Sequence, residues 1–290
     1  EGKKRVAYIT DPNGANYVND TKILPMLKAC DPLFVYEVDA TKTNVDLADF
    51  DLIVISEVTA STATRMSSLK SIDKPTLTMK VHAYKEANGA WGWAKNGFGD
   101  NYEATTIEVT EQGKNHPIFY GVELDAASQL QMVSEVNNKA LTYMNPANFT
   151  SVTGGDIVEL ATIAGEEQCN IFEVPAGTSI AGSTLKATMI QIGLNSSSYA
   201  NITDAGTAIV KNACYYLLDL PIGSSSPTDC NIVKADSEKL SIYPNPVLTH
   251  FTISLTSDIK QDASLLLYNI NGELFLMQNL QLIEGENHLT

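Results

Sequence analysis

The sequence is poor in positive charge and contains no long apolar run. Its 290 residues include 19 Lys and Arg against 34 Asp and Glu, which gives a formal net charge of -15. A surface of this kind repels phosphate backbones and anionic lipid, so we expect no nucleic-acid partner. The apolar runs have strand length and fall short of the roughly 18 residues that a membrane-spanning helix requires. The sequence therefore predicts no membrane span.

Cysteine is also scarce, and the four that occur are widely separated: Cys30, Cys169, Cys214 and Cys230. They are too few for a disulfide-rich scaffold, and no pair has the spacing of a zinc site. The acidic residues likewise lack the spacing of a calcium-binding loop, so we expect no metal. In an oxidising compartment a bridge between Cys214 and Cys230 would pin the segment between them, and free, buried thiols are the alternative.

The local motifs of common nucleotide-binding and catalytic sites are missing. The sequence contains no GxGxxG, GxxxxGK[ST], GxSxG or HExxH. The loop that cradles a nucleotide, the nucleophile elbow of a hydrolase and the helix that holds zinc are therefore not encoded in these forms. We expect no cofactor.

Apolar segments in the first 80 residues predict a parallel α/β sheet. Strands are expected in KRVAYIT, FVYEVDA, DFDLIVIS and KPTLTMKV, which begin at Lys4, Phe34, Asp49 and Lys74. A helix between the first two has Asn19 or Asp20 as a candidate N-cap. Alternation of strands and helices is typical of doubly wound sheets.

The pattern then changes to short strands separated by Gly, Asn and Pro, over about residues 103–194. They are ATTIEVT, QLQMVS, DIVELATIAG, CNIFEVPAG and ATMIQIGL, and they predict an antiparallel or mixed extension of the sheet. An amphipathic helix follows, with Thr203 or Asp204 as N-cap, and ends before Pro221.

A Gly- and Ser-rich segment, GSSSPTD, marks a domain boundary at residues 223–229. We expect an α/β domain over residues 1–222, a linker over 223–236 and a small all-β, sandwich-like domain over 237–290. In the last domain Asn271-Gly272 stands where a tight hairpin turn is expected.

Five segments between about residues 3 and 220 occur in a recognisable order. They are the opening strand with DPNG, DFDLIVIS, KPTLTMK, GKNHPIFYGV and ATMIQIGLNSSSYANITDAGTAIVKNACYYLL. Their order resembles the class I glutamine amidotransferase-like superfamily, particularly its trehalose-utilisation-like branch. The resemblance implies a flavodoxin-like, mostly parallel sheet. In catalytic members a nucleophilic cysteine follows a buried strand, but residues 78–84 contain neither Cys nor Ser at this turn, so we expect no amidotransferase activity.

The loop after Val81 is long and rich in aromatic side chains. Trp91 and Trp93, together with His82, Tyr84, Phe98 and Tyr102, are candidates for a saccharide site, because flat rings stack on the apolar faces of sugars. The alternative is that these rings pack the loop onto the sheet and that His82 is a structural histidine. His116 precedes Pro117 and is expected to shape a turn.

The last domain opens with LSIYPNPV, in which Tyr243, Pro244, Asn245 and Pro246 are followed much later by the turn residue Gly272. Proline cannot donate to a sheet ladder, so this strand must bend or lie at an edge. With FTISL, LYNINGEL and GEN, the segment closely resembles the type A sorting domain of the type IX secretion system of Bacteroidota. The resemblance implies export by the type IX translocon, and we expect the final strands of that domain to be missing here.

Taken together, these patterns predict a protein secreted through the periplasm to the outer-membrane surface or the medium. A chain that begins at Glu1 rather than Met suits prior removal of a signal peptide. The first domain is expected to be a non-catalytic module that binds a saccharide or another extracellular ligand. Two alternatives are an extracellular hydrolase of glycans or amides and a structural surface scaffold.

Overall fold

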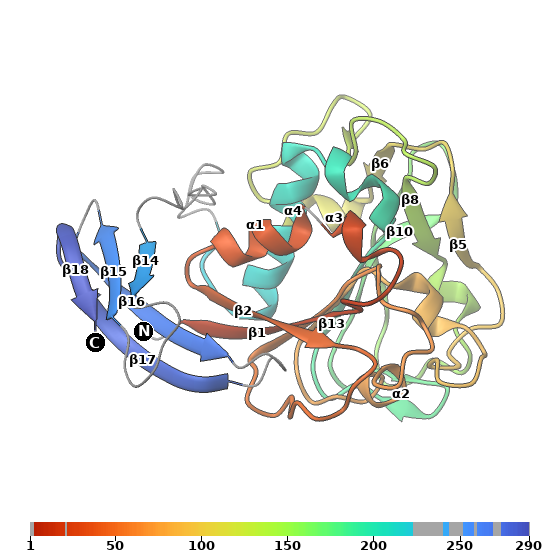
Figure 1. Ribbon diagram of the computed structural model, residues 1–290. Helices are drawn as coiled ribbons and strands as arrows, with labels where there is room; N and C mark the ends of the chain where they lie inside the picture. The colour runs from red at the N-terminus through yellow and green to blue at the C-terminus, as the bar shows by residue number, and fades with distance from the viewer. Residues whose placement is uncertain are drawn as a thin grey trace. The chain divides into compact units, whose positions relative to one another are not determined.

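The computed structural model describes residues 3–20, 22–222, 240–243, 252–257, 260–268 and 274–289. The chain divides into two compact units, Glu1–Ile232 and Val233–Thr290, shown in Figure 1. The predicted linker, residues 223–236, lies outside the described residues, so its bounds stay a prediction. Within the described part of the chain, no helix has the length and apolar character needed to cross a membrane.

The first unit is built on a nine-stranded sheet, and the strands in one half of this sheet are parallel to one another. The parallel strands are β1 (Lys4–Thr10), β2 (Leu33–Asp39), β3 (Leu52–Ile55), β4 (Thr76–Thr78) and β13 (Met189–Ile192). They lie in the order β2-β1-β3-β4-β13. This is the flavodoxin-like arrangement of a doubly wound sheet. The α/β prediction is confirmed.

The other half of the sheet is the predicted β extension. It adds β10 (Cys169–Val174), β9 (Val158–Ile163), β6 (Thr106–Val109) and β7 (Gln129–Gln131), all antiparallel to their neighbours. The sequence did not predict a separate pair, β5 (Phe98–Asn101) with β8 (Leu141–Met144). It also missed a short pair, β11 (Ser179–Ile180) with β12 (Ser183–Thr184).

Helices cover both faces of the parallel half. The α-helices are α1 (Ile23–Ala29), α2 (Met66–Leu69), α3 (Glu111–Lys114) and α4 (Asp204–Leu217), and the 3-10 helices are η1 (Tyr17–Asn19), η2 (Val81–Tyr84), η3 (Pro117–Phe119), η4 (Pro146–Asn148) and η5 (Ser196–Asn201). Helices α1 and α4 lie on one face and α2 lies on the other (Figure 1). Thr203 is the N-cap of α4, as predicted, and its hydroxyl accepts from the N–H of Gly206. Helix α1 instead begins after Lys22, without a side-chain cap.

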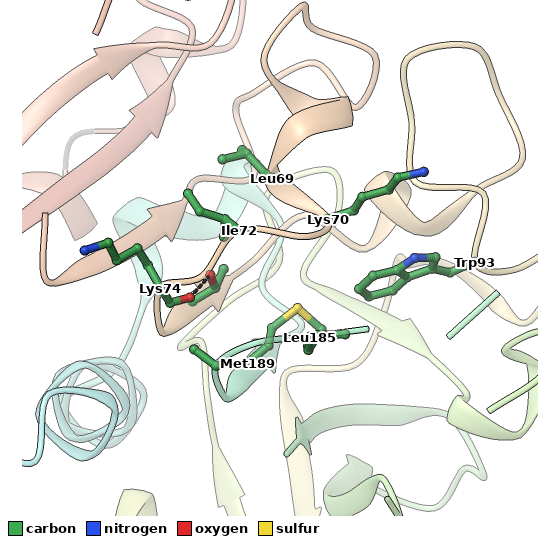
Figure 2. A pocket seen from close by; sticks show the side chains of 9 residues that line it. Leu69, Lys70, Ile72, Lys74, Trp93, Leu185 and Met189 are labelled. Carbon is green, nitrogen blue, oxygen red and sulfur yellow. Dashed lines mark hydrogen bonds between the residues drawn. The ribbon is translucent and has the colours of Figure 1, made fainter. Parts of the chain in front are cut away.

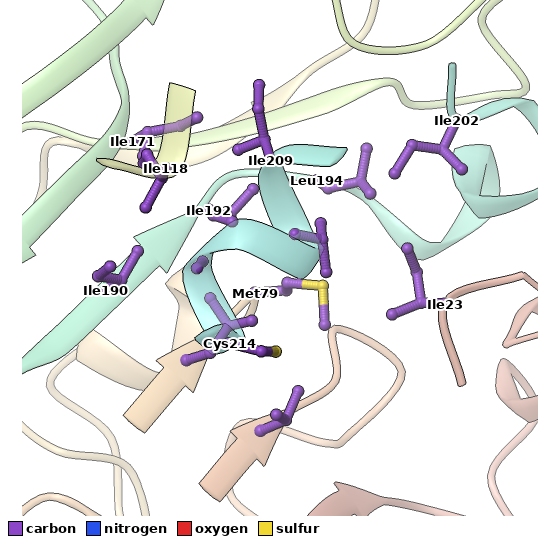
Figure 3. Packing of buried hydrophobic residues seen from close by; sticks show 14 of the residues in the cluster. Ile23, Met79, Ile118, Ile171, Ile190, Ile192, Leu194, Ile202, Ile209 and Cys214 are labelled. Carbon is purple, nitrogen blue, oxygen red and sulfur yellow. The ribbon is translucent and has the colours of Figure 1, made fainter. Parts of the chain in front are cut away.

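Alternate residues along the strands pack into two separate apolar cores, one on each face of the sheet. On β1, Val6 and Tyr8 pack with the α1 and α4 side chains, whereas Ala7 and Ile9 pack on the α2 side. Figure 3 shows the first core around α4, where Ile209 and Cys214 meet residues of β13. Side chains of a strand point alternately to opposite faces, so a continuous apolar run such as LIVI is needed where both faces are covered.

The state of the cysteines excludes the Cys214–Cys230 bridge, which the sequence had left open. Cys214 is a free thiol in the core beneath α4 and forms no bridge. Cys169 is likewise free and buried, whereas Cys30 is disulfide-bonded. Cys230 lies outside the described residues. The Cys214–Cys230 bridge is therefore wrong, because the helix turns the Cys214 side chain into the apolar core.

The second unit is all-β, as predicted. One sheet has the order β14 (Leu240–Tyr243), β15 (Thr252–Ser257) and β18 (Gly285–Leu289), and the other pairs β16 (Gln261–Tyr268) with β17 (Leu274–Leu282). The antiparallel pairing of β16 and β17 agrees with a hairpin. Tyr243 ends β14, while Pro244, Asn245, Pro246 and the turn residues Asn271 and Gly272 lie outside the described residues.

Candidate functional site

Polar and charged side chains gather where the parallel strands end. Glu57 follows β3, Lys80 and His82 follow β4, and Asn195 follows β13. Asp100 lies on β5 and Lys139 directly precedes β8. We call these six residues the carboxyl-edge cluster. Open α/β sheets bind ligands beyond the carboxyl ends of their strands, so the cluster stands where a ligand site is expected.

The crevice between β1 and β3 is filled by the protein's own side chains. Asp20 is buried there and accepts from the hydroxyls of Tyr8, at 2.8 Å, and of Ser56, at 2.9 Å. Burial is the main cause that raises the pKa of Asp20 above its usual range. In a sheet of this strand order the β1/β3 crevice is the common ligand position. Here the partly exposed polar groups are instead His82, beyond β4, and Lys139, ahead of β8.

Glu57 and Lys80 form the inner part of the cluster. The ammonium of Lys80 donates to Glu57 Oε1 at 2.8 Å and to the Glu57 carbonyl at 2.7 Å. The second carboxylate oxygen of Glu57 accepts from the N–H of Ser196 at 3.3 Å, and the Glu57 N–H donates to the hydroxyl of Tyr199 at 3.0 Å. The pair therefore joins the loops that follow β3, β4 and β13.

Asp100 connects the outer part of the cluster. Its Oδ2 accepts from the ammonium of Lys139 at 2.7 Å and lies 3.5 Å from Nε2 of His82. Its Oδ1 accepts from the side-chain amide of Asn195 at 2.9 Å. The pairing of β5 with β8 sets Asp100 beside Lys139, because Asn101 lies opposite Leu141 in the register. Four segments distant in sequence thus meet at one carboxylate.

The environment keeps Asp100 and Lys139 in their charged forms. The interactions with His82 first, and then with Lys139, hold the pKa of Asp100 far below its usual range. The hydrogen bond to Asp100 raises the pKa of Lys139. Each charge is stabilised by an opposite charge within hydrogen-bond reach. Neither group is near neutrality at physiological pH.

The aromatic loop packs inward rather than forming an open platform. Trp91 is 3% exposed and Trp93 is 1% exposed, and both rings contact the buried ring of Tyr84. The indole N–H of Trp91 donates to the carbonyl of Met66 in α2 at 2.7 Å. Of the two alternatives that the sequence left open, packing of the loop onto the sheet holds for Tyr84, Trp91 and Trp93.

The other three predicted site residues stay near the surface. His82 is partly exposed and its ring meets the partly buried ring of Phe98 edge-on, with centroids 5.8 Å apart. Tyr102 is 57% exposed, and the ammonium of Lys139 lies 5.6 Å from the centre of its ring. His82, Phe98 and Tyr102 therefore border the carboxyl-edge cluster. His116 lies elsewhere: it caps η3, as predicted, and its Nε2 is 3.0 Å from Glu173 Oε2.

A small pocket lies at the opposite edge of the sheet, where β4 and β13 begin. Trp93 lines it together with Leu69, Ile72, Leu185 and Met189, and the side chains of Lys70 and Lys74 extend away from its centre (Figure 2). Thr76 and Ala187 complete its lining, which is therefore mixed in character.

No cysteine nucleophile stands at the turn after β4. Residues 79–82 are Met79, Lys80, Val81 and His82. The free thiols, Cys169 on β10 and Cys214 on α4, are buried, and burial raises the pKa of both. A neutral buried thiol is a poor nucleophile. Among the described residues, no group of three or more His, Cys, Asp or Glu side chains could hold a metal ion.

Comparison with known families identifies the end of the chain. Residues 241–290 match the family described as the secretion system C-terminal sorting domain. The predicted sorting domain is therefore confirmed, and it indicates export by the type IX secretion system to the cell surface or the extracellular space. No curated protein matches the chain.

Three solved structures similar to this chain are distant from it in sequence. A GMP synthase-like protein from Thermoplasma acidophilum is 13% identical, with a TM-score of 0.40, over 74% of this chain and 97% of that one. A ThuA-like protein from Parabacteroides merdae ATCC 43184 is 11% identical, with a TM-score of 0.43, over 78% and 93%. An exo-beta-1,4-mannosidase from Opitutaceae bacterium strain TAV5 is 11% identical, with a TM-score of 0.42, over 76% and 36%. These values carry no activity to this chain, and the fold assignment rests on its own strand order.

Sequence reasoning found His82 but missed the charged residues around it. Glu57 carried a usable signal, because it directly follows a predicted buried strand, and Lys80 stands next to the end of another. Asp100, Lys139 and Asn195 carried none of comparable strength. Their meeting depends on the β5–β8 pair and on the loop after β13, which the order of segments along the chain does not reveal.

Proposed function

We propose that this is an exported protein whose α/β unit binds a saccharide at the carboxyl-edge cluster and does not catalyse amide transfer. The proposal includes a bacterial source among the Bacteroidota and a signal peptide ahead of the mature chain, since both accompany sorting domains of this kind. Export itself rests on the family match of residues 241–290. The ligand site rests on the geometry of the α/β unit.

The observation that carries the binding role is the charge state of the cluster. A general acid or base works best with a pKa near the ambient pH, yet the pKa of Asp100 is shifted downward and that of Lys139 upward. Both groups are thereby held as fixed charges. Fixed charges in a partly exposed cluster suit the recognition of a polar ligand by hydrogen bonds.

The saccharide assignment follows from the mixture of groups. Sugar hydroxyls both donate and accept. The cluster offers the partly exposed ammonium of Lys139 and imidazole of His82, with the Asp100 carboxylate and the Asn195 amide behind them. Tyr102 adds an exposed ring beside Lys139, on which the apolar face of a pyranose can stack. The buried tryptophans have no part in this version of the site.

A glycan array probed with the full chain, followed by calorimetric titration of each hit, tests the proposal. We expect at least one saccharide to bind, and Tyr102→Ala to weaken that binding by about tenfold, since one aromatic contact contributes about 1 kcal/mol or more. Tyr120→Ala is the matched control, because Tyr120 is also exposed but lies after η3. Absence of binding to every saccharide, or equal effects of the two variants, would contradict the proposal.

A second candidate, an extracellular hydrolase of glycans or amides, is favoured by one contact. His82 Nε2 lies 3.5 Å from the Asp100 carboxylate and the imidazole remains partly exposed, so it is placed to take a proton from water. Release of product from chromogenic glycosides or anilides, abolished in His82→Gln, would support this function. Activity that persists in His82→Gln would rule out His82 as the base.

A further inference from the structure

Within the carboxyl-edge cluster, His82 and Lys139 are more exposed than the two carboxylates, whereas Lys80 is as buried as Asp100. The side chains of His82 and Lys139 are 29% and 31% exposed, whereas those of Asp100 and Glu57 are only 11% and 7% exposed. A ligand that approaches from solvent therefore meets an imidazole and an ammonium first. The carboxylates lie behind them and hold them in place.

The partly exposed ammonium of Lys139 contrasts with the charge of the chain as a whole. The formal net charge is -15, so most exposed surface repels anions, whereas an exposed ammonium attracts them. The titratable groups that face His82 and Lys139 are Asp100, Glu57, Lys80 and Tyr102. Within the cluster, the ammonium groups of Lys80 and Lys139 balance the carboxylates of Glu57 and Asp100.

Lys139 has hydrogen-bonding capacity beyond its internal partner. An ammonium carries three N–H donors, and Lys139 directs one of them to Asp100. The same ammonium lies over the ring of Tyr102, which is the most exposed aromatic side chain beside the cluster. An anionic group that reaches Lys139 therefore lies beside the ring of Tyr102.

Building on the proposed function, we propose that the ligand is an acidic saccharide, a pyranose that bears a carboxylate or a sulfate. Its anion contacts Lys139 and His82, and its ring stacks on Tyr102. Carboxylate and sulfate share the charge and the acceptor oxygens that these donors recognise. The two sources are distinguished by the probes below.

Calorimetric titration of the full chain with glucuronate, glucose 6-sulfate and glucose at low ionic strength tests the inference. We expect one or both acidic sugars to bind at least about tenfold more tightly than glucose, since hydrogen bonds to charged groups contribute about 1.5 kcal/mol or more. Added salt should reduce this difference. Acetate and inorganic sulfate serve as anions without a ring, and either binding as tightly as the matching sugar would overturn the inference.

Substitutions of Lys139 test whether its positive charge binds the anion of the ligand. Lys139→Gln should weaken acidic-sugar binding about tenfold and weaken glucose binding less, and Lys139→Arg should restore most of the affinity for acidic sugars. Lys74→Gln is the matched control, because Lys74 precedes β4 at the opposite edge of the sheet.

The outcomes separate this inference from the proposed function. Equal affinity for glucose and the acidic sugars, with Tyr102→Ala weakening both, would overturn the acidic ligand and leave saccharide binding intact. Binding of no sugar, neutral or acidic, would overturn both. Loss of binding in Lys139→Gln without rescue by Lys139→Arg would show that binding does not depend on the positive charge at position 139.

Discussion

The ammonium of Lys139 lies 2.7 Å from Oδ2 of Asp100. The two residues are 39 positions apart in sequence, and they meet because β5 and β8 pair antiparallel. The pair is the structural centre of the outer carboxyl-edge cluster, since Asn195 and His82 reach the same carboxylate. The effect of removing this pair should therefore be measurable both in the free energy of unfolding and in the affinity for ligand.

Asp100 should stabilise the fold in a pH-dependent way. Its folded-state pKa is lowered, chiefly by His82 and then by Lys139, so its contribution is fully present above the unfolded value of about 3.9 and is lost as the pH falls below it. We expect Asp100→Asn to be less stable than wild type at pH 7, with the difference shrinking towards pH 3. Urea denaturation at both pH values measures this. Glu111→Gln, which breaks an exposed pair with Lys114, should show a far smaller change, and a constant difference for Asp100→Asn would contradict the assignment.

Asp20 should show the opposite dependence on pH. Burial raises its folded-state pKa, so the stability that it contributes is present below the unfolded value of about 3.9 and is lost as the pH rises through the folded value. We expect the stability of wild type relative to Asp20→Asn to fall between about pH 4 and pH 7. Urea denaturation across this range tests the sign. If the stability of wild type relative to Asp20→Asn rises with pH instead, the hydrogen bonds from the hydroxyls of Tyr8 and Ser56 to the charged carboxylate outweigh the cost of burying it.

The sheet could be predicted from sequence because its physical causes are local. A strand covered on both faces needs consecutive apolar residues, as in LIVI of β3, and a helix such as α4 needs a cap and an apolar stripe. The strands of the main sheet were found for this reason. The β5 segment FGDN and the β8 segment LTYM lack such a signature, and the pair that they form was missed.

The candidate site was harder to predict because composition does not reveal burial. Trp91 and Trp93 in a Gly-rich loop are equally compatible with an exposed platform and with a packed anchor, and only the contact with Tyr84 and α2 decides between them. Asp100 and Asn195 come from segments 95 residues apart. Their contact follows from tertiary structure, which a periodic pattern does not encode.

Gly193 should be irreplaceable at the end of β13. A Cβ atom at this position would collide with the carbonyl oxygen of Thr142 and, at 2.5 Å, with the side-chain nitrogen of Asn170. That nitrogen donates to the carbonyls of both Thr142 and Gly193, so the collision also breaks a buried hydrogen-bonded link. We expect Gly193→Ala to lower the free energy of unfolding by roughly 2 to 4 kcal/mol, measured by urea denaturation. Gly165→Ala is the control: a Cβ there meets nothing within 4 Å and only the positive φ opposes it, so an equal loss in both variants would contradict the steric explanation.

The cysteines should give one bridge and two protected thiols. Cys30 is disulfide-bonded, and Cys169 and Cys214 are free and buried. With four cysteines in the chain, we expect Cys30 to pair with Cys230. Under non-reducing conditions, alkylation should modify Cys169 and Cys214 only after unfolding, and peptide mapping by mass spectrometry should recover the Cys30–Cys230 peptide. Recovery of a bridge that contains Cys214, or four alkylated cysteines without reduction, would contradict this pairing.

Asn287 should be required for the order of the sorting unit. Its side-chain oxygen accepts from the N–H of Ile283 at 2.9 Å, and its amide donates to the carbonyls of Ile283 and Gly285, each at 3.0 Å. Because the side chain is buried, its removal leaves backbone groups of the β17–β18 connection without partners, at a cost of about 1 to 3 kcal/mol. We expect Asn287→Ala to speed hydrogen exchange at residues 283–287.

Asn287→Asp separates the two halves of this interaction, because it keeps the acceptor but replaces both donors with a charged oxygen that faces two carbonyls. It should therefore be as damaging as Asn287→Ala at neutral pH, despite its closer shape. His288→Ala, which removes a half-exposed neighbour, is the control and should leave exchange unchanged. Since residues 241–290 are the sorting domain, the two Asn287 variants should also lower the exported fraction of the protein in a type IX-competent host. Normal export despite faster exchange would show that the translocon does not require an ordered β17–β18 connection.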